Sequence, residues 1–159
     1  TRQEAVKIVQ APTRKWHKHT AEFMRVSKRL MLRHPNLTSH VLTGISHREC
    51  LAFKRTCQAV FDHMNGWFGI SPLDALSQGV PVLAGLDDWN IAQIKDFTGA
   101  ANLPWIVTRD ENSLEASLER LIEAAEERVR VGRASRKFME DHWTEEQVLR
   151  VLFETYKAL

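Results

Sequence analysis

Short apolar runs alternate with longer amphipathic segments along most of the chain. The apolar runs have the length and composition of buried strands and lie at residues 5–12, 37–44, 59–64, 80–85 and 104–108. The amphipathic segments have helical spacing and lie at residues 20–34, 47–57, 71–79, 87–99, 112–129, 130–142 and 144–159. Because strands that alternate with helices pair in parallel, the pattern predicts a sheet covered by helices on both faces.

The predicted fold is α/β, with a doubly wound, mostly parallel, Rossmann-like sheet of five or six strands followed by C-terminal helices. A chain of 159 residues can bury a sizeable core, so we expect one domain over residues 1–159. It opens with Thr1 rather than Met, which suggests an excised piece or a processed product, and we expect it to be a piece of a longer protein. Ligands of such folds bind beyond the carboxyl ends of the strands, which selects the loops at 11–19, 44–47, 62–71 and 85–90.

Several predicted helices carry start signals and stripes of apolar residues. The expected N-caps are Thr20, Ser71 with Pro72 at the first helical position, Asn112 in a capping box with Glu115, and Thr144 in a second box with Gln147. The expected core-facing stripes are Phe23, Met24, Leu30 and Met31 in the first helix and Leu114, Leu118, Leu121 and Ala125 in the fifth. These positions predict which side of each helix meets the sheet.

Charge is uneven along the chain, which bears on its partners. The net charge is +2, but residues 1–60 carry +9 and residues 61–159 carry −7. A basic half suits phosphates, an anionic membrane surface or nucleic acid, while a solvated basic helix face is the structural alternative. The sequence has no aromatic-interleaved RNA motif and no recognition-helix signature, so we do not expect a nucleic-acid partner.

The length of the apolar runs and the two cysteines bear on where in the cell the protein is found. No apolar run approaches the roughly 20 residues that a bilayer span requires, and no signal peptide is visible. Cys50 and Cys57 are seven residues apart, which suits two reduced thiols on one helical face rather than a disulfide or a zinc site. We therefore expect a cytoplasmic protein, with a peripheral position at the inner membrane face left open.

The stretch NGWFGISPLDALSQGVPVLAG, residues 65–85, has the composition of an anion site. Gly66 and Gly69 allow the backbone to approach a ligand closely, and Ser71 begins a helix whose free N–H groups suit a phosphate. Asp74 lies in the first turn, where its carboxylate could accept hydrogen bonds from sugar hydroxyls. The structural alternative is an ordinary strand–loop–helix–strand crossover in which the acid stabilises the helix dipole.

A second candidate is the loop at residues 11–20, which follows the first strand and holds Arg14, Lys15 and Lys18. Cations at the carboxyl end of a strand suit a diphosphate, since Arg supplies a planar fork and Lys a point charge. A solvated basic loop is the alternative. Both candidates fall at the same predicted edge of the sheet, which favours one shared site.

Other polar and aromatic candidates have simpler interpretations. His17 and His19 form an H-x-H pair without the further ligands of a metal site, so we expect no metal. Asp87 and Asp88 precede a helix and are expected to cap it. Trp16 and Trp67 lie in the two loops and could pack on the domain or stack on a base or sugar. P-loop and dinucleotide glycine motifs are absent.

These motifs resemble a known family. The segment WFGISPLDALSQGVPVLAG is similar to the signature of the C-terminal, donor-binding domain of retaining GT-B glycosyltransferases, the large group-1 (family 4-like) set. PTRKWHKHT resembles that family's basic loop, and the last helix resembles the segment that crosses back to the N-terminal domain. The resemblance implies a hexosyltransferase-like enzyme that takes a sugar from a UDP- or GDP-sugar, without another cofactor.

The resemblance also implies roles for individual residues. Arg14 and Lys18 would be the catalytic cations that contact the diphosphate and stabilise the leaving nucleotide. Asp74 would hold the ribose hydroxyls. The remaining residues expected to bind the nucleotide-sugar are Gly69, Ile70 and Ser71, through their backbone N–H groups, and Gly44, in the loop after the second strand.

The chain departs from the family pattern at several positions. Gly66 stands where the family often has a Glu, and Asp74 stands where it usually has the longer Glu. One strand–helix unit common in the family is expected to be missing before the signature. Asp62 and His63, just upstream, are candidates to supply the missing polar groups.

We therefore expect a nucleotide-sugar-binding domain from a two-domain glycosyltransferase, inactive in transfer without its N-terminal acceptor domain. Two alternatives stay open at this point. One is a GT-B nucleotide-sugar 2-epimerase. The other is a non-catalytic module whose basic half binds polyanions or a membrane surface.

Overall fold

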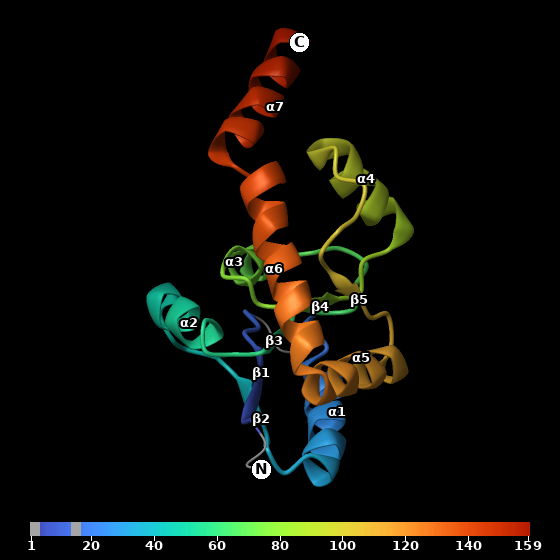
Figure 1. Cartoon of the computed structure of the whole chain (residues 1–159). Coiled ribbons are helices and arrows are strands. Elements are labelled where there is room, and N and C mark those ends of the chain that lie inside the picture. Colours follow the sequence, from blue (N-terminus) through green and yellow to red (C-terminus); the bar gives the residue numbers. More distant parts are fainter. Residues whose placement is uncertain (1–3, 14–16) are drawn as a thin grey trace.

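The computed structural model describes residues 4–13 and 17–159 (Figure 1). The predicted site residue Arg14, with Lys15 and Trp16, lies outside the described residues. The strands are β1 (Val6–Gln10), β2 (Leu37–Val41), β3 (Ala59–Phe61), β4 (Val82–Ala84) and β5 (Ile106–Val107). The helices are α1 (Thr20–Arg33), α2 (His47–Lys54), α3 (Ile70–Ser77), α4 (Asp88–Thr98), α5 (Glu111–Glu123), α6 (Ala125–His142) and α7 (Glu145–Lys157).

The strands form one parallel sheet in the order β2-β1-β3-β4-β5, which confirms the predicted doubly wound α/β fold with five strands. From β1 the chain first adds β2 on one side and then returns to add β3 on the other side. The strand order therefore reverses between β1 and β3. A crevice at such a reversal, beyond the carboxyl ends of the strands, is the usual ligand site of this architecture.

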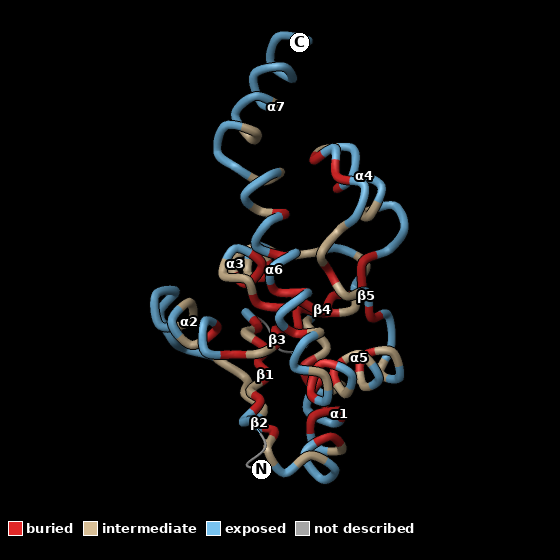
Figure 2. The backbone as a smooth tube through the Cα atoms, in the orientation of Figure 1, coloured by how far each residue is buried: buried red, intermediate tan, exposed pale blue. Residues whose placement is uncertain are grey.

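Helices cover both faces of the sheet, as Figure 1 shows. On one face, α1 and α5 pack Phe23, Leu30, Leu114 and Leu118 against the strands. On the other face, α3 and α6 contribute a second core, which includes Leu76 and Phe138. Figure 2 shows that the buried residues are concentrated on the strands and on the helix sides that meet them.

An ion-pair ladder joins the basic and acidic halves of the chain. The three arginines Arg25, Arg29 and Arg33 of α1 pair with the three glutamates Glu111, Glu115 and Glu119 of α5. Hydrogen bonds from these arginines lower the pKa of Glu111 and Glu115, and hydrogen bonds from His34 and Arg33 lower the pKa of Glu119. Part of the charge asymmetry in the sequence is thus neutralised inside the domain rather than offered to a partner.

The core-facing stripe of α1 differs from the prediction at two positions. Phe23 and Leu30 are buried as expected, but Met24 and Met31 are exposed. Val26 completes the buried side instead, because it lies three residues after Phe23 and four before Leu30. Each methionine follows a buried residue directly, so helical rotation places it about 100° away from the core.

The predicted N-caps of α1 and α5 are wrong. The cap of α1 is His19, whose backbone is left-handed (φ 52°), and Thr20 is the first helical residue. The cap of α5 is Asp110 rather than Asn112, because its carboxylate accepts from Ser113 N (2.7 Å) and starts the helix two residues earlier. Asp110 and Ser113 form a capping box in place of the predicted box of Asn112 and Glu115.

The observed starts of the other helices agree in part with the sequence predictions. Thr144 caps α7 as predicted and accepts from Gln147 N, but the Gln147 side chain donates to Phe97 O and does not complete a box. Asp87 caps α4 as predicted. Ala125 begins α6 and is not part of the α5 stripe, in which the three leucines are buried.

The cysteines are free, as predicted, but they do not share a helix. Cys50 lies in α2, whereas Cys57 lies beyond its last residue, Lys54.

Helix α7 points away from the body of the domain and is almost entirely exposed in Figure 2. Within residues 4–13 and 17–159, no helix has the length and apolarity required to cross a membrane.

Candidate functional site

The site lies at the strand-order reversal, where the loops after β1 and β3 meet. Lys18 lies in the first loop, and its ammonium Nζ donates to Asp62 Oδ1 (2.8 Å) in the second loop. Asp62 Oδ2 also accepts from Gly69 N (3.1 Å), the residue that caps α3. A Cβ built on Gly69 would lie 3.3 Å from Lys18 Nζ, so the lysine lies directly against the start of the helix.

Two side chains, the buried Gln10 and the half-buried His19, hold this arrangement in place. The Gln10 amide nitrogen, at the end of β1, donates to Lys18 O (2.6 Å) and Asp62 O (3.0 Å). His19 Nδ1 accepts from Met64 N (3.1 Å), which fixes the left-handed turn before α1 to the loop after β3. The position of Lys18 therefore depends on contacts between the two loops rather than on its own loop alone.

An aromatic pair, His63 and Trp67, lies beside Lys18, and Trp67 lines the site. His63 is fully buried and its ring lies 4.1 Å from that of Trp67, while Lys18 Nζ lies 5.0 Å from the Trp67 ring centroid. Burial lowers the pKa of His63 to about 4, and nearby Asp62 opposes this only partly. His63 Nδ1 accepts from Asn65 N, so the ring is neutral with its proton on Nε2, 3.3 Å from Asp62 Oδ2.

Trp67 thus makes contacts within its own domain, one of the two interpretations that the sequence left open. Its side chain nevertheless remains 45% exposed, which leaves part of the ring accessible to a ligand. The packing interpretation is confirmed, and stacking on a base or sugar stays a prediction.

The start of α3 differs from the prediction. Its N-cap is Gly69 rather than Ser71, so Ile70 is the first helical residue and Ser71 the second. Pro72 is compatible with this start because the N–H groups of the first helical turn have no partner within the helix. The Ser71 side chain is therefore free of the capping role and points to another residue, Lys54.

Lys54 is a feature of the site that sequence reasoning missed. Its side chain is only 1% exposed, and Nζ donates to Ser71 O (2.9 Å) and Ser71 Oγ (2.6 Å). Asp74 Oδ2 lies 3.9 Å from the same ammonium. A lysine near the end of an amphipathic helix is normally solvated, so nothing in the local pattern distinguishes it. Only the packing of α2 against α3 buries it.

A groove connects these elements along the carboxyl edge of the sheet. It consists of two hollows, of about 630 and 470 Å³, which share Ala11, Thr13, Ile70 and Ser71 as common lining. The larger hollow also reaches His17, Lys18, Trp67 and Gly69. The smaller one reaches Gly44, His47, Cys50, Lys54 and Asp74. One groove therefore holds all the predicted site residues that the structure describes: Lys18, Gly44, Gly69, Ile70, Ser71 and Asp74.

Gly66 adopts a backbone conformation that favours glycine, and a Glu, which the family often has at this position, would not fit here. Its φ is +91°, and a Cβ at this position would lie 2.7 Å from Asp87 Oδ2. Its carbonyl oxygen accepts from Asp87 N (2.7 Å), which joins the site loop to the start of α4. The nearest carboxylate of the loop is Asp62, which is directed at Lys18 and Gly69 instead.

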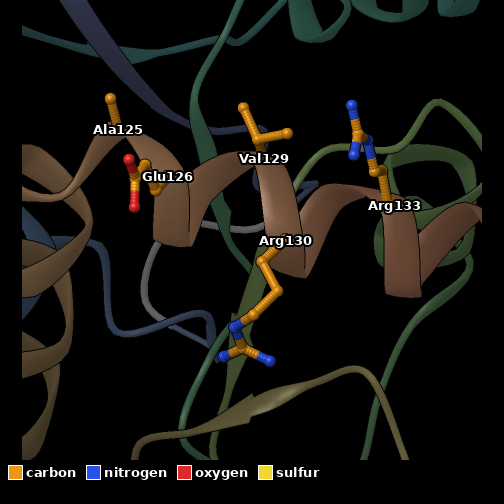
Figure 3. Close-up of a pocket in the computed structure, with 5 residues that line it drawn as sticks. All are labelled: Ala125, Glu126, Val129, Arg130 and Arg133. Atoms are coloured by element: carbon orange, nitrogen blue, oxygen red, sulfur yellow. The ribbon is translucent and has the colours of Figure 1, made fainter.

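Two further features of the described residues lie outside the groove. A cluster with metal-ligand spacing, His34, Glu119 and Glu123, lies near the amino end of β2, and Arg33 already binds Glu119. A hollow of about 530 Å³ lies over the first turns of α6 (Figure 3). Figure 3 shows Arg130 and Arg133 pointing to opposite sides of the helix, so these two polar groups do not converge.

Comparisons with known proteins were made by sequence and by structure. No protein-family model and no curated protein sequence matches the chain. Its structure is similar to the C-terminal domain of a group 1 family glycosyl transferase, LpcC, from Francisella tularensis. The TM-score is 0.71 at 14% identity, over 89% of this chain and 88% of that one.

Two further structures extend this comparison. S. aureus TarM, crystallised with Fondaparinux, alpha-GlcNAc-glycerol and UDP, matches with a TM-score of 0.72 at 13% identity. The match covers 95% of this chain but only 35% of TarM. A Listeria monocytogenes structure named as a UDP-N-acetylglucosamine 2-epimerase matches with a TM-score of 0.55 at 15% identity, over 82% of this chain and 39% of that one. The chain therefore has the fold of the C-terminal domain of GT-B glycosyltransferases.

Proposed function

We propose that this chain is the donor-binding domain of a glycosyltransferase and that its groove binds a nucleoside diphosphate sugar, such as a UDP- or GDP-sugar. One observation carries the proposal. Lys18 Nζ lies against Gly69 at the start of α3, at the strand-order reversal, in a groove that continues to Asp74. A cation next to a helix N-terminus is a suitable place for a diphosphate.

Each part of the donor has a chemically suitable place in the groove. The diphosphate would lie by Lys18 and the N–H groups of Ile70 and Ser71. The ribose hydroxyls would bond Asp74, which lies one turn into α3, and the base would enter the smaller hollow beside Gly44. Arg14, outside the described residues, is proposed as the second cation on the diphosphate.

The proposed chemistry is transfer of the sugar with retention of configuration. The bond between the anomeric carbon and the diphosphate oxygen would break, with its electron pair staying on the leaving nucleoside diphosphate. An acceptor hydroxyl oxygen would bond to the anomeric carbon on the same face, and its proton would pass to the leaving diphosphate. Lys18 and the α3 amides would stabilise that developing negative charge. Since cationic side chains provide this role, the proposal needs no metal or other cofactor.

The acceptor would come from a partner domain. The chain spans 35% of TarM and 44% of WaaG, a glycosyltransferase involved in lipopolysaccharide biosynthesis. Helix α7 exposes Leu149, Leu152, Phe153 and Tyr156 on one segment, which suits a surface that another domain covers. We therefore propose that the chain alone binds the donor but transfers no sugar, and that its cytoplasmic, membrane-peripheral position depends on the rest of the protein.

Titration with UDP, GDP and their sugars tests the proposal, with calorimetry and amide chemical shifts as readouts. We expect saturable binding to at least one nucleotide, with shifts concentrated at Gly69, Ile70 and Ser71. A heat or shift response to none of them would refute the proposal. Binding to any polyanion, abolished by salt and spread over the surface, would favour the non-catalytic alternative instead. Chemical conversion of a UDP-sugar by the full-length protein without an acceptor would favour the epimerase alternative.

A further inference from the structure

The carboxylate of Asp62 occupies the place where the proposed site needs an anion. Its Oδ1 accepts from Lys18 Nζ (2.8 Å) and its Oδ2 accepts from Gly69 N (3.1 Å). These two donors flank the start of α3, where the diphosphate of a donor would lie. We propose that Asp62 is a built-in counter-anion that competes with the donor diphosphate for Lys18 and the Gly69 amide. This inference rests on the proposed function.

The burial of Asp62 supports this role. Its side chain is 4% exposed, and a buried carboxylate requires charged or hydrogen-bonding partners to remain ionised. His63 faces Oδ2 at 3.3 Å, but burial keeps this imidazole neutral, with its pKa at about 4. Within the described part of the chain, Lys18 is therefore the one cation paired with Asp62.

A lysine is also paired with a carboxylate in the smaller hollow of the groove, as Lys18 is with Asp62. Lys54 Nζ lies 3.9 Å from Asp74 Oδ2, so each described lysine of the groove has a carboxylate beside it. A diphosphate that enters this groove meets no net positive charge from these two pairs. It gains the full charge of Lys18 only if the lysine turns from Asp62 toward the ligand, or if the Asp62 charge is removed.

Removal of the Asp62 charge should therefore tighten anion binding. Asp62→Asn keeps the size of the side chain and an oxygen that can accept from Gly69 N, but it releases the Lys18 charge. We expect Asp62→Asn to bind both inorganic pyrophosphate and UDP or GDP at least about tenfold more tightly than the unmodified chain, as expected for a freed charge-assisted bond. The control is Asp96→Asn, an exposed aspartate of α4, which should leave both affinities unchanged.

A different result with the same variant would refute the counter-anion role. If Asp62 instead orients Lys18 for the ligand, Asp62→Asn will bind pyrophosphate and nucleotides no more tightly, or less tightly, and the counter-anion role is refuted. Should this variant fail to fold, the unmodified chain still decides the question. Pyrophosphate must then shift the Gly69 amide resonance as that N–H leaves Asp62, and an unmoved Gly69 resonance at saturation overturns the inference.

The two proposals can fail separately. Tighter pyrophosphate binding in Asp62→Asn, with no nucleotide bound by either protein, would uphold the counter-anion and refute the donor site. Nucleotide binding that is no tighter in Asp62→Asn would uphold the donor site and refute the counter-anion. If neither protein binds either probe, both proposals are refuted.

Discussion

Lys54 and Ser71 are joined by two hydrogen bonds, from Lys54 Nζ to the carbonyl oxygen and to the hydroxyl oxygen of the serine. The contact ties the end of α2 to the second residue of α3, so it positions the helix start that lines both hollows of the groove. A lysine that is 1% exposed is unusual in a surface helix, and its role here is to hold the site's frame.

This contact predicts a loss of stability when the ammonium is removed. Lys54→Met keeps the length of the side chain but leaves two oxygens of Ser71 without their donor. We expect the free energy of unfolding to fall by about 1–3 kcal/mol, the usual effect of losing hydrogen bonds from a buried charged group. Chemical denaturation measures the change. The same substitution at the exposed Lys95 of α4 is the control, and an equally small effect at both positions would contradict the structural role of Lys54.

The proposed donor site predicts that two substitutions in the groove weaken nucleotide binding. Lys18→Ala removes the described cation next to α3, and Asp74→Ala removes the proposed ribose ligand. We expect each to weaken UDP or GDP binding by about tenfold or more, since a charge-assisted bond contributes about 1.5–3 kcal/mol. Calorimetry measures the affinity.

Matched controls separate this effect from a general change in charge. Lys28→Ala on the exposed side of α1 and Asp96→Ala on α4 change the same residue types outside the groove. Both should bind as the unmodified chain does. If Lys28→Ala weakens binding as much as Lys18→Ala, the interaction depends on overall charge and the site assignment is wrong.

His63 predicts how stability depends on pH. Burial lowers its pKa to about 4, whereas an unfolded histidine titrates near 6.5. Between these values the unfolded chain binds more protons than the folded one, so the free energy of unfolding decreases as the pH falls. We expect a loss of roughly 1–2 kcal/mol between pH 7 and pH 5 from this residue.

Denaturation at several pH values tests this prediction. His63→Gln should flatten the profile between pH 7 and pH 5, while His47→Gln, at an exposed position, should retain it. The glutamates of the α1–α5 ladder have lowered pKa values, so their contribution is lost only at more acidic pH and does not interfere in this range. A His63→Gln profile as steep as that of the unmodified chain would show that another group titrates.

The fold was predictable because its signals are local and repeated. Apolar runs of strand length between amphipathic segments led to the observed parallel sheet, and the positions of Lys18 and Gly69 follow from the edge at which their strands end. Helix starts were less predictable, because several polar residues compete as caps within one turn. Asp110 rather than Asn112 caps α5 because Ser113 completes its box.

The electrostatics of the site were not predictable from local patterns. Lys18 and Asp62 are 44 residues apart, and only the packing of two loops through Gln10 brings their charges together. Asp62 was a candidate polar group in the sequence, but its partner was not identified. Lys54 had no distinguishing signal at all, because its burial depends on the contact between α2 and α3.

The two cysteines predict a direct report of ligand binding. Burial raises the pKa of Cys57 to about 11, while Lys7 and Thr56 oppose this shift only partly, so its thiolate is scarce at neutral pH. Cys50 is only half-buried and lines the smaller hollow of the groove beside Lys54 and Asp74. A thiol reagent should therefore label one cysteine of the folded chain quickly and the other slowly, and Cys50→Ser should remove the fast phase.

A nucleotide that fills the smaller hollow should shield Cys50. At a ligand concentration ten times the dissociation constant, about one site in eleven is free, so the fast labelling phase should slow by about tenfold. The slow phase from Cys57 should not change, because that thiol lies outside the groove lining and is already buried. Saturable nucleotide binding that leaves the Cys50 rate unchanged would place the base elsewhere, and it would contradict the assignment of Gly44 and the smaller hollow to the donor.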